Sequence, residues 1–176
     1  VLFRSGFHDN LRTRMRRIGS TAFLVSAKTV DVPMMRLLVS AGADITLTNI
    51  DNSTPLMLAS GLDTLNENED IGLEGEAVAA VSYLLQLGAD PHAVNRNGEN
   101  AMHGAIGYRG WLKVAQLLNE QKVRFDLQNV LGWTPLRIAD GVFVAGFLKA
   151  QPKLAEYTRG LYASAGMRSE EHTSEL

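Results

Sequence analysis

Apolar residues between positions 95 and 127 recur with helical spacing in two short segments. In the first segment four residues share one face of a helix that begins near Asn100: Ala101, Met102, Ala105 and Ile106. In the second, the apolar stripe consists of Val114, Leu117 and Leu118. Gly98 favours a tight turn before this helix pair. Neither helix is long enough to be stable alone, so we expect the unit to stack on similar units.

The same unit recurs along the chain. Its first helix starts at four related triplets, Thr21-Ala22-Phe23, Thr54-Pro55-Leu56, Asn100-Ala101-Met102 and Thr134-Pro135-Leu136, whose first residues are 33, 46 and 34 positions apart. The end of the second helix repeats as Gly42-Ala43-Asp44 and Gly88-Ala89-Asp90, again 46 residues apart. Both markers therefore place an insertion of 46 − 33 = 13 residues in the second unit.

Each repeated residue has a local physical role. Threonine caps the first exposed N–H groups of a helix, and proline at the next position has the helical φ and lacks an N–H that would go unused. Glycine after the second helix supplies the left-handed residue that ends it. Beyond Pro152, the spacing of Leu154, Tyr157, Leu161 and Tyr162 predicts a terminal helix.

On these motifs the chain resembles ankyrin repeat proteins. The resemblance implies an all-α fold, an ankyrin repeat solenoid of stacked helix-turn-helix units with hairpin loops, closed by a variant final repeat. We expect a single domain over 6–167, with repeats at about 16–48, 49–94 (with the insertion at 63–76), 95–128 and 129–165.

The two ends carry a different kind of sequence. Residues 1–5 and 168–176 resemble translated sequencing-adapter read-through, and the first residue is not Met. We therefore interpret the chain as a bacterial-type fragment with artefact tails. A signal peptide could be missing, which leaves open a cytoplasmic or a periplasmic or secreted location for this soluble domain.

Composition narrows the kinds of partner. The net charge is −2, the chain has no cysteine, and no run of 18 apolar residues occurs. These values predict no nucleic-acid partner and no membrane partner. We also expect a monomer. Arg12, Arg14, Arg16 and Arg17 could form a basic patch, but without interleaved aromatic residues we favour solvated side chains.

The insertion in the second repeat is acidic. Between Asp63 and Glu76 it has six carboxylates and no basic residue, so we expect it to extend into solvent. Asn66, Asn68 and Asp70 alternate like calcium ligands, yet Ile71 and Ala77 occupy the positions where a calcium loop needs Gly and Glu. We favour an acidic loop without bound calcium.

No catalytic motif occurs in the sequence. Nucleophile elbows, phosphate loops and zinc-helix motifs are missing, and His103 has no ligand partner at a suitable spacing. The resemblance implies that His103 is structural and that its ring nitrogens bond backbone groups near a hairpin. We therefore predict no enzyme activity, no catalytic residues, no cofactor and no metal.

The predicted function is that of a scaffold that binds another protein through hairpin tips and the concave helical face. The resemblance assigns contact roles to Arg17, Ile18, Ser20, Lys28, Ile50, Asp51, Ser53, Arg96, Asn97, Glu99, Tyr108, Val130, Leu131 and Trp133. Trp133 is the strongest candidate, because tryptophan dominates interface energetics. Two alternatives remain: a regulatory or substrate-recruiting module of a larger enzyme, and an inhibitor-like module that acts through the acidic insertion.

Overall fold

The computed structural model describes residues 18–64, 72–142 and 150–169. These residues form helices and no β-strand, which confirms the all-α prediction for the described part of the chain. The helices are α1 (Ala22–Lys28), α2 (Val32–Ser40), α3 (Pro55–Ala59), α4 (Glu74–Gln86), the π-helix η1 (His103–Arg109), α5 (Leu112–Glu120), α6 (Pro135–Ala139) and α7 (Pro152–Ser164).

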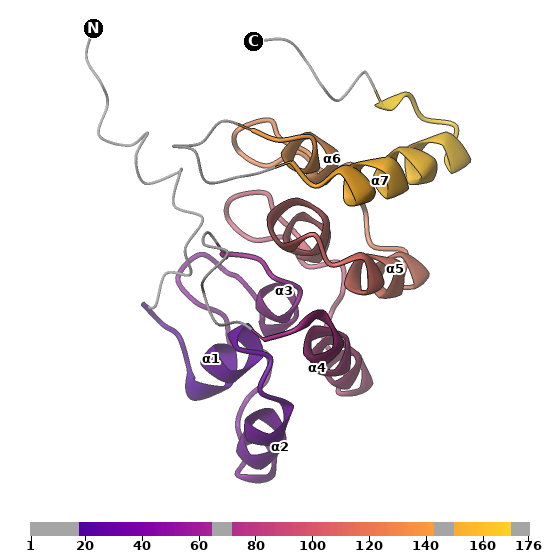
Figure 1. The fold of residues 1–176 in the computed structure, drawn as a ribbon. Coiled ribbons are helices and arrows are strands. Elements are labelled where there is room, and N and C mark those ends of the chain that lie inside the picture. Colours follow the sequence, from indigo (N-terminus) through magenta and orange to yellow (C-terminus); the bar gives the residue numbers. More distant parts are fainter. Residues whose placement is uncertain (1–17, 65–71, 143–149, 170–176) are drawn as a thin grey trace, which may run out of the picture.

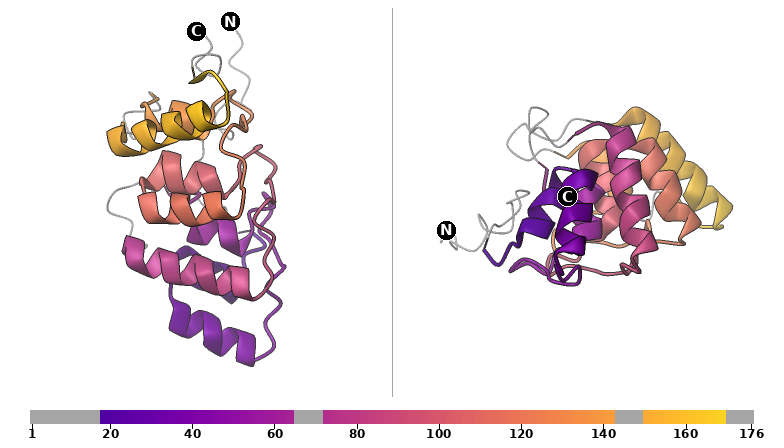
Figure 2. Two further views of the ribbon diagram at one scale, coloured as in Figure 1. Left: turned by 90° about the vertical axis from the view of Figure 1, so that its right-hand side faces the viewer. Right: turned by 90° about the horizontal axis from the view of Figure 1, so that it is seen from below.

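The helices stack as four successive pairs. The stack rises from α1 and α2 to α6 and α7 (Figure 1). First helices pack on first helices, as α1 does on α3 and η1 on α6, and second helices on second helices, as α4 does on α5. The segments that join one pair to the next run together along one side of the stack (Figure 2). This is the predicted solenoid of helix pairs.

Threonine side chains begin three of the first helices, as predicted. The Oγ1 atoms of Thr21, Thr54 and Thr134 accept hydrogen bonds from backbone amides three residues later, at 3.2, 3.2 and 3.1 Å. Pro55 and Pro135 follow two of these caps at the first helical position. Asn100 replaces threonine in the third pair, where its Oδ1 accepts from the amide of Met102 at 3.1 Å.

The second helices all end in one left-handed residue, which fixes the register between repeats. Gly42, Gly88, Lys122 and Gly166 have φ values of 86°, 84°, 58° and 69°. In each case the next amide donates back to the carbonyl five residues earlier, as from Ala43 to Leu38 at 2.9 Å. Lys122 therefore occupies a position that favours glycine.

The acidic insertion differs from its prediction at both ends. Glu74 and Glu76 lie in the first turn of α4, where carboxylates favour the positive end of the helix dipole. The Oε2 atom of Glu76 also accepts from the amide of Leu73 at 2.7 Å. Asp63 is buried. The expected loop is therefore wrong at Glu74 and Glu76, which are helical, and the expected exposure is wrong at Asp63. Glu76 is exposed to solvent, as predicted. Asn66, Asn68 and Asp70 lie outside the described residues.

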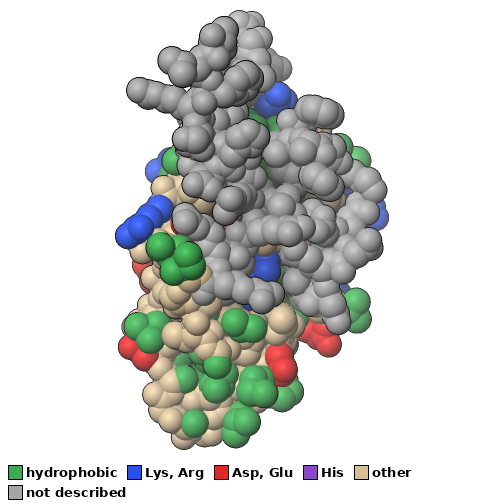
Figure 3. Space-filling view, turned by 90° about the vertical axis from the view of Figure 1, so that its left-hand side faces the viewer, with side chains coloured by type: hydrophobic (Ala, Val, Ile, Leu, Met, Phe, Trp, Pro, Cys, Tyr) green, Lys and Arg blue, Asp and Glu red, His purple; other side chains and the backbone are tan. Residues whose placement is uncertain are grey.

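The core runs through all four repeats. One buried position of each first helix contributes an apolar side chain: Phe23, Leu56, Met102 and Leu136. On α7 the predicted stripe is borne out by buried Leu154 and Tyr162 and by the half-buried Tyr157 and Leu161. Apolar side chains also remain exposed at the end of the stack formed by α1 and α2 (Figure 3).

The left-handed residue at position 122 gives a stability prediction. Lys122→Gly removes the strain of a side chain at φ 58°, so we expect the free energy of unfolding to rise by about 0.5–1 kcal/mol. Urea denaturation followed by circular dichroism measures this change. Gly88→Ala, the matched reverse change at φ 84°, should destabilise the fold. A loss of stability in Lys122→Gly would contradict the strained left-handed conformation at this position.

Candidate partner-binding surface

The joining segments are hairpins built on three buried asparagines. The Oδ1 atoms of Asn49, Asn95 and Asn129 each accept two backbone amides, from the residues two and four positions later, at 2.9–3.0 Å. The backbone N–H of each asparagine also donates to the backbone carbonyl four residues later, at 3.4, 2.9 and 3.0 Å. One side chain therefore satisfies the polar backbone of a whole turn.

Backbone hydrogen bonds connect each hairpin to the next. The donors are the amides of Ile50, Arg96 and Val130, and the acceptors are the carbonyls of Ile18, Asp51 and Asn97, at 3.0, 2.8 and 2.8 Å. These bonds use main-chain atoms only. The tips therefore form a continuous row whose side chains can vary without breaking the row.

A buried polar layer lies directly beneath the tips of repeats two to four. The Tyr108 hydroxyl donates to Glu99 Oε1 at 2.5 Å, and Asn129 Nδ2 donates to the same oxygen at 3.2 Å. Asn95 Nδ2 donates to Ser53 Oγ at 3.3 Å. Burial and the Glu99 carboxylate together raise the pKa of Tyr108 well above its ordinary value. Tyr108 therefore stays protonated and serves as a hydrogen-bond donor.

Repeat one contributes a buried cation to this region. Lys28 Nζ donates to the Leu62 carbonyl at 2.9 Å and to Thr64 Oγ1 at 2.6 Å. Asp63, with φ 63°, accepts from Ser53 Oγ at 3.3 Å. Burial raises the pKa of Asp63 to about 7, and the nearby Glu99 adds to the increase, whereas Lys28 opposes it. The layer thus holds two carboxylates and one ammonium group.

His103 lies in the core, as the resemblance implied. Its Nδ1 accepts from the amide of Asn100 at 3.2 Å, which leaves the Nε2–H to donate to the carbonyl of Trp133 at 3.3 Å. Burial lowers its pKa. The neutral ring therefore links the third repeat to the hairpin of the fourth.

The structure separates the residues predicted to contact a partner into three groups. Ile18, Arg96 and Val130 are exposed at the tips, with exposed fractions of 63% for Ile18 and 55% for Val130. Half-buried residues of the same row are Ser20, Ile50, Asp51, Asn97, Leu131 and Trp133, and Tyr108 lies below them. Lys28, Ser53 and Glu99 are buried and bond within the chain. Arg17 lies outside the described residues.

Trp133 has contacts of its own within the fold. Together with Tyr108 it packs on a small buried cluster of Ile138 and Val142. Its carbonyl accepts from His103, and its amide donates to Asn129 Oδ1 at 3.0 Å. A substitution at Trp133 therefore affects packing as well as the tip surface.

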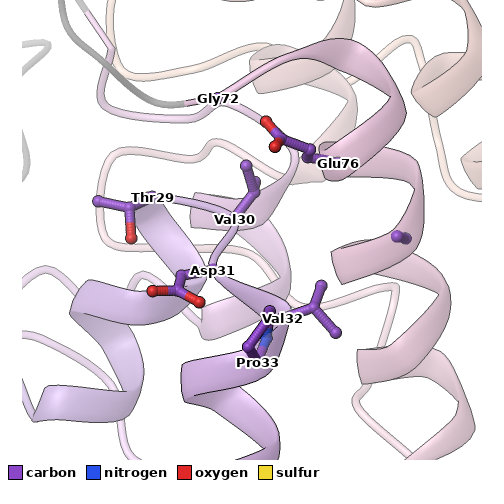
Figure 4. Close-up of a pocket in the computed structure, with 8 residues that line it drawn as sticks. Thr29, Val30, Asp31, Val32, Pro33, Gly72 and Glu76 are labelled. Atoms are coloured by element: carbon purple, nitrogen blue, oxygen red, sulfur yellow. The ribbon is translucent and has the colours of Figure 1, made fainter.

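An open cleft of about 520 Å³ lies at the opposite end of the helices from the hairpins. It is formed by the turn between α1 and α2 and by the start of α4 (Figure 4). Its two carboxylates cap helices: Asp31 accepts from the Met34 amide at 3.0 Å, and Glu76 accepts from Leu73. Helix capping therefore accounts for both acidic residues of the cleft.

Among the described residues, no group of three or more His, Asp or Glu side chains is placed to hold a metal ion. None of their helices has the length and apolar content needed to cross a membrane.

Comparison with known proteins agrees with this geometry. The ankyrin repeat family model matches residues 51–96, which include the hairpin tip at Asp51 and the helix pair α3 and α4. These matched residues are an ankyrin repeat, and the all-α solenoid is consistent with an ankyrin repeat domain. Such repeats are generally protein–protein interaction modules and are typically non-enzymatic.

Several curated proteins share these ankyrin repeats. Protein lin-12 of Caenorhabditis elegans is 27% identical over 119 residues, which cover 68% of the chain and 7% of lin-12. Delta-latroinsectotoxin-Lt1a of Latrodectus tredecimguttatus is 41% identical over 76 residues, 42% of the chain and 6% of the toxin. Human neurogenic locus notch homolog protein 1 is 36% identical over 101 residues, 54% of the chain and 4% of the relative. The chain thus spans a small part of each.

The structural role of the hairpin asparagines was not predicted from the sequence. A signal for them exists in the sequence, because Asn49, Asn95 and Asn129 are 46 and 34 residues apart, the same intervals that separate the helix starts. The sequence holds no comparable signal for the burial of Lys28 beside Asp63. These two residues are 35 positions apart and come together only because two repeats stack.

Asp63 should make stability depend on pH. Its pKa of about 7 in the folded chain lies above its value of about 3.9 in an unfolded chain, so the folded state binds this proton more tightly. The stabilisation from Asp63 is therefore fully present below pH 4 and is lost as pH rises through 7. Between pH 5 and 8 we expect the wild type to lose about 2 kcal/mol more than Asp63→Asn.

Urea denaturation at each pH measures this difference. Asp90→Asn is a matched control, because Asp90 is an exposed carboxylate that accepts from the His92 amide at 2.9 Å, an acceptor role that asparagine keeps. It should retain the wild-type pH dependence. Equal pH profiles for the wild type and Asp63→Asn would show that Asp63 titrates normally.

Proposed function

We propose that this ankyrin domain is a non-enzymatic scaffold that binds another protein through its row of hairpin tips. The proposal rests on one observation: the groups that hold each hairpin together differ from the side chains that it exposes. The buried asparagine and the main-chain bonds hold the turn, whereas side chains such as Arg96 and Val130 are exposed. Exposed tip side chains are thus available for recognition.

The tips suggest the chemistry of the partner surface. Apolar side chains prevail in the row, with Ile18, Ile50, Val130, Leu131 and Trp133 exposed or half-buried. Arg96 adds a cation from the middle hairpin, and Asp51 adds a carboxylate one hairpin earlier. The partner should therefore present an apolar patch flanked by at least one acidic group that can pair with Arg96.

The proposed contact surface consists of Ile18, Ser20, Ile50, Asp51, Arg96, Asn97, Val130, Leu131 and Trp133, with Tyr108 beneath it. Lys28, Ser53 and Glu99 are left out because their burial gives a partner no access. These three residues support the row from below through their hydrogen bonds. A rigid row lowers the entropy lost on binding.

Tip substitutions should separate binding from folding. We expect Arg96→Ala and Val130→Ala each to weaken capture of a partner about tenfold, equivalent to about 1.4 kcal/mol, with the thermal midpoint nearly unchanged. Quantitative pull-down followed by titration of the captured protein measures the loss. Trp133→Ala should weaken binding too, but with lower stability because of its contacts with Ile138 and Val142.

Lys113→Ala provides the matched control. Lys113 is exposed on α5, a second helix of the stack, away from the tips. It should leave capture unchanged. Binding that depends on Lys113 and ignores Arg96 and Val130 would place the contact surface elsewhere.

A further inference from the structure

The end of the stack formed by repeat one carries an apolar surface. Val25 of α1 is 48% exposed, and Met34 and Leu37 of α2 are 43% and 60% exposed. Hydrophobic side chains gather at this end of the molecule in the space-filling view (Figure 3). We call Val25, Met34 and Leu37 the N-terminal face.

The position of Val25 is buried between repeats elsewhere in the chain. Counted from the start of each first helix, its equivalents are Leu58, Gly104 and Ile138, all of them buried. A Cβ on Gly104 would lie 2.4 Å from the Leu62 amide nitrogen of the preceding repeat. Ile138 lies against Gly107, also of the preceding repeat. This position therefore faces the repeat that comes before.

The positions of Met34 and Leu37 are also covered in the later repeats. Counted from the left-handed residues Gly42, Gly88 and Lys122, the equivalents of Met34 are Ala80 and Val114, both fully buried. The equivalents of Leu37 are Tyr83, which is 8% exposed, and Leu117, which is half-buried against the core. The Arg36 guanidinium of the preceding repeat lies over the Tyr83 ring at 4.3 Å. All three residues of the N-terminal face thus occupy stacking positions.

The opposite end of the described chain has different chemistry. Counted from Gly166, Arg159 of α7 stands where Met35, Val81 and Ala115 are fully buried in the other second helices. Arg159 is exposed and pairs with Asp140. A charged end does not complement an apolar one, which argues against a second copy stacked head to tail on the N-terminal face.

We infer that the N-terminal face receives a further ankyrin repeat of the same polypeptide, stacked on α1 and α2. This repeat is a helix pair that covers Val25, Met34 and Leu37 as repeat one covers the equivalent residues of repeat two. The inference is independent of the proposed function, because this face lies at the end of the stack and the contact surface lies along the tips.

The test extends the chain by one repeat in the inferred register. A copy of residues 95–127 is joined to Met15, the position equivalent to Gln128, so that the copied Gly107 meets Val25 as it meets Ile138 in the native chain. The expected result is a higher urea midpoint and a larger m-value, because more surface is exposed on unfolding. The amides of Val25 and Leu37 should also exchange more slowly with solvent.

Leu37→Lys then tests the contact itself. In the unextended chain Leu37 is largely exposed, so the midpoint should change little, whereas in the extended chain the substitution should remove most of the gain. Val130→Lys, at an exposed hairpin tip, is the matched control and should leave the gain intact.

Three results would overturn the inference. One is an extended chain without a higher midpoint or slower exchange at α1 and α2, whether or not the added repeat folds. Another is a Leu37→Lys effect of equal size in both chains. The third is a dimer of the unextended chain in sedimentation velocity that Leu37→Lys dissociates, which would assign the face to a second copy.

Discussion

The structure depends on the burial of one asparagine at the base of each hairpin. A tight turn leaves several backbone amides without partners, and a buried unsatisfied amide costs about 1–3 kcal/mol. Asn49, Asn95 and Asn129 each satisfy two of them with a single oxygen, and the tip carbonyls then accept the amide of the next hairpin. Because main-chain hydrogen bonds connect the hairpins, the row does not depend on the tip side chains.

The polar layer beneath the row connects this constraint to the helices. Glu99 accepts from Tyr108 of η1 and from Asn129 of the next hairpin, and His103 reaches the Trp133 carbonyl. The bonds to Asn129 and to Trp133 cross the boundary between repeats three and four, so the third repeat orients the hairpin of the fourth. Stacking of apolar helices and alignment of the hairpins are therefore coupled, and neither the helices nor the hairpins would hold their register alone.

Sequence patterns predicted the elements whose causes are local. Thr54 and Thr134 cap helices, and Gly42 and Gly88 end them, because these residues act on backbone atoms a few positions away. Burial across repeats could not be predicted in this way. Lys28 looked like a surface lysine, yet it bonds Leu62 and Thr64 of the next repeat. Because the insertion is acidic, its last residues were expected to form a loop, whereas α4 already begins at Glu74.

Hydrogen exchange of single amides, followed by NMR in the Asn95→Ala variant, tests the central role of the hairpin asparagines most directly. The account predicts that the amides of Asn97 and Glu99, which donate to Asn95 Oδ1, lose their protection, while those of Leu131 and Trp133 on Asn129 keep most of theirs. Unchanged protection at Asn97 and Glu99 would show that the hairpin does not depend on its asparagine, and would contradict the account.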